Sequence, residues 1–125
     1  NGWAGAVVTL QADVHYSELN WFNAALGQAA ADVTPWITSD ADALAVLAAL
    51  DQYVTVEQRW FQLRAGLHRP VHVVIPQPSP WWTLSSGKRS VWWPSAQLYR
   101  QSAGGDWRDA LNQLRATLES EQARV

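Results

Sequence analysis

Apolar residues in this chain form short runs that alternate with segments of helical spacing. Residues 6–10, 53–56 and 71–75 are short and rich in Val, Ile and Leu, so each run predicts a strand. Leu98 and Tyr99 predict one further short strand, and residues 32–38 carry Pro35, which limits any strand there to a brief or edge position. The pattern therefore predicts several short strands along the chain.

The segments between these runs predict four helices. Residues 16–26 space Leu19, Phe22 and Leu26 on one face and are followed by Gly27, which is typical of a helix end. Ser39 begins an S-x-x-D helix start, and residues 58–67 predict a helix after the strand at 53–56. Asp106 is a capping residue for a last helix. Its expected apolar stripe consists of Trp107, Leu111, Leu114 and Leu118.

This alternation is typical of an α/β protein with βαβ units. It predicts a Rossmann-like open, mostly parallel sheet with helices on both faces, within a single domain over residues 1–125. Ligands of such sheets bind beyond the carboxyl ends of the strands. The segments to search are therefore 11–15, 57–59 and 76–82.

Composition and charge narrow the classes of partner. The net charge is −2 and the basic residues are scattered, so nucleic acid is not an expected partner. The chain has no Cys, which excludes disulfides and thiolate metal sites and favours a cytoplasmic location. Its apolar runs fall far short of the roughly 20 residues that span a bilayer, so no membrane segment is expected. His, Asp and Glu show no metal-ligand spacing, and we expect neither metal nor cofactor.

The second half of the sequence carries motifs that match a known family. Residues 91–95 read VWWPS, 98–101 read LYRQ and 105–107 read GDW, while 49–56 and 69–76 contain ALD-x-V-x-V-like and RPV-x-V-like segments. At this spacing they resemble the C-terminal portion of bacterial glycosyltransferases that follow tetratricopeptide repeats, related to O-linked N-acetylglucosamine transferases and heptosyltransferases. The resemblance implies the nucleotide-sugar-binding half of a GT-B fold. It also implies a fragment whose upstream domain or repeats are missing.

The resemblance places a donor site at the carboxyl ends of the strands, and the sequence departs from the family there. Glu57, Gln58 and Gln62 stand where the family has an Asp, a hydroxyl and a His, and Ala12 and Asp13 replace a Lys and a Gly. The candidate donor-binding residues are Glu57, Gln58, Gln62, Pro76, Trp81 and Trp82. No catalytic residue is assigned, because the acceptor-side domain usually supplies the base of GT-B enzymes.

Each candidate also has a plain structural interpretation. Glu57 can simply interact with a helix dipole, and Gln58 and Gln62 can face solvent. The Trp pairs at 81–82 and 92–93 can stack on a base or sugar, or can pack a long loop against the sheet. His72 lies among Val and Ile, which favours a hydrogen-bonded core histidine over a catalytic one.

Two functions follow as hypotheses. In the first, the chain is a degenerate, glycosyltransferase-related domain that forms part of a nucleotide-sugar site and is inactive alone. In the second, the fold serves as a non-catalytic interaction or structural module. Whether the parent is an enzyme stays open. A sheet and a Trp-rich loop without their covering domain also predict exposed apolar surface and a homodimer.

Overall fold

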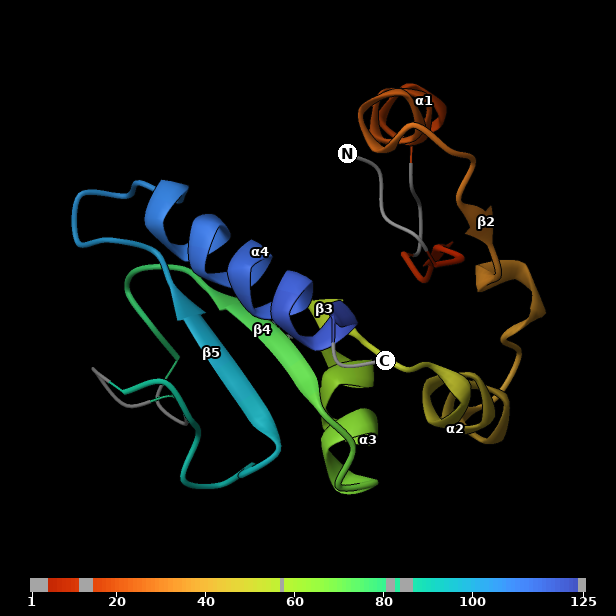
Figure 1. Cartoon of the computed structure of the whole chain (residues 1–125). Helices are drawn as coiled ribbons and strands as arrows, with labels where there is room; N and C mark the ends of the chain where they lie inside the picture. The colour runs from red at the N-terminus through yellow and green to blue at the C-terminus, as the bar shows by residue number, and fades with distance from the viewer. Residues whose placement is uncertain (1–4, 12–14, 57, 81–82, 84–86, 124–125) are drawn as a thin grey trace. The chain divides into compact units, whose positions relative to one another are not determined.

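A computed structural model describes residues 5–11, 15–56, 58–80, 83 and 87–123 (Figure 1). The chain divides into two compact units, Asn1–Asp42 and Ala43–Val125, and each is described by itself. Parallel strands and helices alternate in both, so the protein is α/β as predicted. The expectation of one domain over the whole chain stays a prediction.

The first unit is built on a βαβ arrangement. Strand β1 (Val8–Thr9) pairs in parallel with β2 (Ala31–Asp32), and helix α1 (Tyr16–Leu26) connects them. Gly27 ends α1 in the left-handed region with a φ of 79°, as its sequence position predicts. The strands are shorter than the apolar run at 6–10 indicates. Beyond β2, the chain turns into the 3-10 helix η1 (Thr34–Trp36) because Pro35 favours a first helical turn.

The second unit contains a three-stranded parallel sheet in the order β3-β4-β5 (Figure 1). Strand β3 (Val54–Thr55) leads through α3 (Arg59–Gly66) to β4 (Val71–Ile75), and β5 (Ala96–Arg100) pairs with β4 along its whole length. Helix α2 (Asp40–Ala49) precedes β3, and the Ser39 hydroxyl accepts a hydrogen bond from the Asp42 N–H at 3.1 Å. The S-x-x-D helix start is confirmed.

Helix α4 (Arg108–Ala123) covers the sheet face that carries Tyr99 and Val74. Ala110 and Leu114 are buried against that face, and Trp107 and Leu118 are partly buried beside them. Leu111 is 50% exposed, so the prediction that it belongs to the buried stripe is wrong. With about 3.6 residues per turn, Leu111 lies at one edge of the stripe that Ala110 and Leu114 form, and not at its centre.

Side chains alternate between the two faces of β4, as the pleat of a strand requires. Val74 lies on the α4 side, and so does His72 two residues before it. Val71, Val73 and Ile75 point the other way and are fully buried. Helix α3 packs against β4 and contributes the buried Phe61 and Ala65. A strand that is apolar except for His72 and is covered by helices is the arrangement that the sequence predicts for the centre of a parallel sheet.

Candidate functional site

The carboxyl ends of β3, β4 and β5 gather the segments that follow Thr55, Ile75 and Arg100. This edge is where the sequence places a donor site. Among the six candidates, Glu57, Trp81 and Trp82 lie outside the described residues. Gln58, Gln62 and Pro76 are described. They differ in exposure and in hydrogen bonding.

The side chain of Gln58 is hydrogen-bonded within the protein. It is the N-cap of α3, and its side-chain oxygen accepts from the Trp60 N–H at 3.4 Å. Its side-chain nitrogen donates to the Tyr53 hydroxyl at 2.8 Å and to the Thr55 hydroxyl at 3.1 Å. Burial raises the pKa of Tyr53, while the bonds from Thr55 and Gln58 lower it. Both donor positions of the Gln58 amide are therefore used inside the protein.

Gln62 and Pro76 are both exposed. Gln62 lies one turn into α3, where an amide can reach a ligand near the helix start without carrying charge. Pro76 follows β4 directly, and the next residue, Gln77, donates its N–H to the Gln101 side chain at 2.9 Å. Among the described candidates, Gln62 therefore offers one exposed amide, and Arg59 at the start of α3 is an exposed cation beside it.

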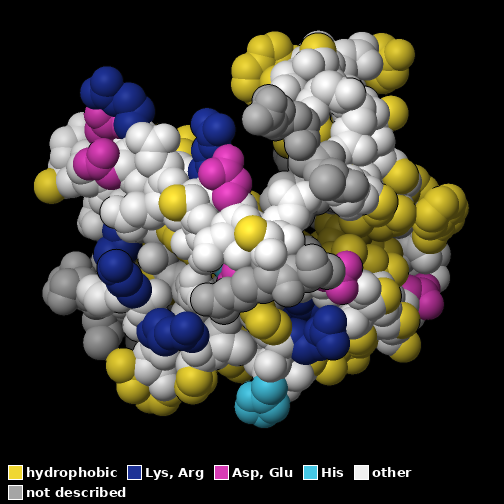
Figure 2. Space-filling view, viewed as in Figure 1, with side chains coloured by type: hydrophobic (Ala, Val, Ile, Leu, Met, Phe, Trp, Pro, Cys, Tyr) yellow, Lys and Arg dark blue, Asp and Glu magenta, His cyan; other side chains and the backbone are white. Residues whose placement is uncertain are grey.

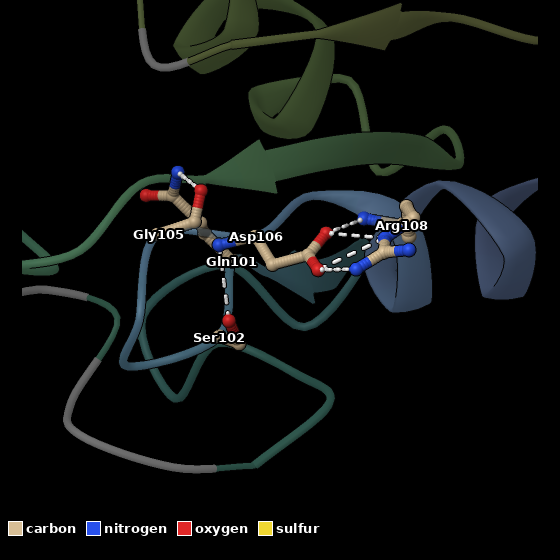
Figure 3. A network of polar contacts seen from close by, with 5 residues as sticks. All are labelled: Gln101, Ser102, Gly105, Asp106 and Arg108. Atoms are coloured by element: carbon tan, nitrogen blue, oxygen red, sulfur yellow. Dashed lines mark hydrogen bonds and ion pairs between the residues drawn. The ribbon is translucent and has the colours of Figure 1, made fainter.

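A network of polar contacts lies at the end of β5 on this edge (Figure 3). The Gln101 amide accepts from the Gln77 N–H and donates to the Gly105 carbonyl at 2.7 Å. Asp106 accepts from the Arg108 N–H at 2.8 Å and pairs with the Arg108 guanidinium at 2.6 Å. Hydrogen bonds from Arg108 lower the pKa of Asp106, and the same contact raises that of Arg108. Asp106 is confirmed as the cap of the last helix.

Arg64 is a buried cation that the sequence did not reveal. Its guanidinium is fully buried and donates to carbonyl oxygens of Pro70 at 3.0 Å, Leu50 at 2.8 Å, Asp51 at 3.3 Å, and Leu47. Burial has the largest effect on the pKa of Arg64 and lowers it. Three of the four acceptors lie at and just beyond the end of α2, whose last carbonyls lack partners within the helix. Arg64 therefore fastens α2 to the start of β4.

His72 is the centre of a buried hydrogen-bonded chain. Its Nδ1 lies 2.9 Å from the Tyr99 hydroxyl and its Nε2 lies 2.8 Å from the Gln52 side-chain oxygen. The Tyr99 hydroxyl is also 2.9 Å from the Gln97 side-chain oxygen, and Gln52 donates to Glu121. Burial lowers the pKa of His72, with a smaller opposing effect from Glu121 and a further lowering by Arg64. The interpretation of His72 as a hydrogen-bonded core residue is confirmed.

One of the two Trp residues at 92–93 packs against helix α3. Trp93 meets Phe61 of α3 edge to face, with ring centroids 6.1 Å apart. Trp92 is 61% exposed. Arg100 donates to the Gly87 carbonyl at 2.9 Å and to Thr83, which ties this segment to β5. Of the two described Trp residues in the segment, one supports the packing interpretation.

A pocket of about 400 Å³ lies between the beginning of β5 and the last turns of α4. Gln97 contributes from the strand, and Ala116, Thr117, Ser120 and Glu121 contribute from the helix. The pocket lies at the opposite end of β5 from the candidate donor site. Sequence reasoning missed it, because its lining residues are ordinary polar positions of an amphipathic helix.

Comparison of the chain with protein-family models, curated proteins and solved structures finds no match. Within the described residues, no helix has the length and hydropathy needed to cross a membrane. The same residues contain no group of three or more His, Asp and Glu side chains that could hold a metal ion.

Proposed function

We propose that this chain is a degenerate relative of the donor-binding half of GT-B glycosyltransferases and that it neither transfers sugar nor binds a nucleotide sugar tightly on its own. The motifs at 91–95, 98–101 and 105–107 support the relationship, and the alternation of parallel strands and helices is compatible with it. The finer GT-B assignment is part of the proposal.

The inward hydrogen bonding of Gln58 carries the functional half of the proposal. A donor site needs hydrogen-bond donors that can turn toward a diphosphate at the start of α3. The Gln58 amide instead joins Tyr53 to Thr55, and turning it outward would leave both hydroxyls without this donor. Arg108, a cation at the same edge, is paired with Asp106. Each charge-assisted bond lost to a phosphate costs about 1.5 to 3 kcal/mol, so two losses weaken binding by at least roughly a hundredfold.

Calorimetric titration of the full chain with uridine and guanosine diphosphates and their sugars tests this proposal. We expect dissociation constants in the millimolar range or weaker, and a micromolar constant for any of these ligands would overturn it. A double substitution, Gln58→Thr with Gln62→His, restores the hydroxyl and imidazole of the family pattern. At pH 6 we expect it to tighten diphosphate binding about tenfold. Gln113→His, on exposed α4 surface, is the matched control and should leave binding unchanged.

The second hypothesis, an interaction module, draws support from α1. This helix has no buried residue, and Tyr16 and Trp21 are 76% and 74% exposed. Hydrophobic side chains gather at the surface over α1 in Figure 2. Exposed aromatic groups of this size are typical of protein interfaces. Loss of self-association or of partner binding in Trp21→Ser, with the fold unchanged by circular dichroism, would favour this function.

A further inference from the structure

The pocket between β5 and α4 has polar groups that are held in place from behind. Gln97 and Glu121 line it on opposite elements. Inside the protein, the Gln97 side-chain oxygen contacts Tyr99, and the Glu121 carboxylate accepts from Gln52. Tyr99 and Gln52 are in turn joined through the buried His72. Close polar contacts through His72 therefore connect the two sides of the pocket through the core.

This connection matters because binding a ligand normally costs the freedom of the side chains that hold it. Gln97 and Glu121 have already lost much of that freedom in the folded protein. Thr117 is fixed as well, since its hydroxyl donates to the Gln113 carbonyl at 3.0 Å. The hydroxyl oxygen keeps two lone pairs that can accept hydrogen bonds. Among the described residues of the pocket, the Glu121 carboxylate and the Thr117 hydroxyl are therefore acceptors that are held in place before a ligand binds.

The charge of the pocket selects the ligand. Among the described residues that line the pocket, Glu121 carries a negative charge and none is Lys or Arg. Within the described residues, the last turn of α4 contains no basic residue, and the negative end of the helix dipole attracts positive charge to this region. The positive charge of Arg89 lowers the pKa of the neighbouring Tyr99. The Arg89 guanidinium itself donates to the Pro94 carbonyl at 3.0 Å. The pocket therefore favours a positive charge.

We propose that this pocket binds a small organic cation that carries N–H donors, such as a primary ammonium or a guanidinium group. The cationic group pairs with the Glu121 carboxylate and donates a further hydrogen bond to the Thr117 hydroxyl oxygen. Ala116 forms the apolar part of the wall and contacts the carbon portion of the ligand. The site is independent of the proposed donor edge and does not require that proposal to be correct.

Titration of the isotope-labelled full chain with propylammonium and methylguanidinium chlorides tests the proposal by amide nuclear magnetic resonance. We expect saturable shifts of the Gln97 side-chain amide and of the backbone amides of Ser120 and Glu121. Tetramethylammonium chloride has the charge but no N–H donor, and sodium acetate has the opposite charge. Both should shift these signals at least about tenfold less at equal concentration. Equal shifts with tetramethylammonium, or none with any cation, would overturn the proposal.

Three substitutions make the test specific. Glu121→Gln removes the charge but keeps an acceptor for Gln52, and it should weaken binding about tenfold. Ala116→Leu fills the pocket from an exposed helix position without altering charge, and it should abolish the saturable shifts. Glu119→Gln removes an equal charge from the exposed surface of the same helix, where Glu119 pairs with Arg115. If Glu119→Gln weakens binding as much as Glu121→Gln, the effect is general electrostatics and the proposal fails.

Discussion

Replacing the buried guanidinium of Arg64 should destabilise the second unit more than any surface change of equal charge. In Arg64→Met the side chain keeps a similar length but loses every donor. The Leu47 carbonyl is then buried without this partner, which costs about 1 to 3 kcal/mol. The carbonyls of Leu50, Asp51 and Pro70 are partly buried, and each loses about 0.5 to 1 kcal/mol because water can replace the donor. The free energy of unfolding should fall by about 2.5 to 6 kcal/mol, a large share of a typical domain's stability.

Urea denaturation followed by circular dichroism measures this loss. Arg64→Lys retains the charge but not the planar fork, so it should lose about 2 kcal/mol. Arg69→Met is the matched control, because Arg69 is exposed and donates to the same Leu50 carbonyl at 3.1 Å. It should lose less than about 1 kcal/mol. If Arg64→Met unfolds within about 1 kcal/mol of the original chain, or if Arg69→Met is equally damaging, the fastening role of Arg64 is refuted.

Three further predictions concern pH, packing and assembly. Since burial lowers the pKa of His72 below its ordinary 6.5, the unfolded chain binds the proton first, and stability should decline as pH falls below that value. The decline should flatten in His72→Gln and persist in His15→Gln. The lowered pKa values of Asp42 and Asp106 reduce the free energy of unfolding only as pH falls below about 3.8, so their effect is separated in pH from that of His72. Leu114→Ala should lower the free energy of unfolding by about 2 to 4 kcal/mol and Leu111→Ala by less than about 1, and equal losses in urea would contradict the observed orientation of α4. The chain should self-associate, and light scattering that shows monomer at every concentration would count against exposed α1 as an interface.

Local signals of the sequence were reliable where one residue type decides the backbone. The strand Val71–Ile75 has the predicted bounds because four apolar residues around a single His form a run that is typical of a strand buried on both faces. Gly27 and Asp106 end and begin helices as predicted, since their effects are confined to neighbouring residues. The runs at 6–10 and 53–56 gave strands of two residues each, because the extent of pairing depends on a neighbouring strand that the run does not specify.

The candidate site was harder to predict because its geometry depends on distant partners. Gln58 was predicted as the first residue of a helix and is the N-cap of α3, but the sequence could not show that its side chain turns toward Tyr53 and Thr55. His72 meets Gln52 and Tyr99, which are 20 and 27 residues away in the chain. Arg64 shows no distinguishing motif, and its acceptors are main-chain carbonyls, which every sequence provides. A buried polar group is recognised only once the surrounding carbonyls have been located.

The absence of any buried residue in α1 has a consequence for its motion. A helix gains most of its stability from an apolar face packed against other elements, and a helix of eleven residues is marginal in water without that packing. The amide protons of α1 should therefore exchange with solvent through local opening, whereas those of β4 should exchange only when the whole second unit unfolds. The exchange rate of α1 in the presence of other molecules then becomes a direct sensor of whatever covers Trp21 and Tyr16.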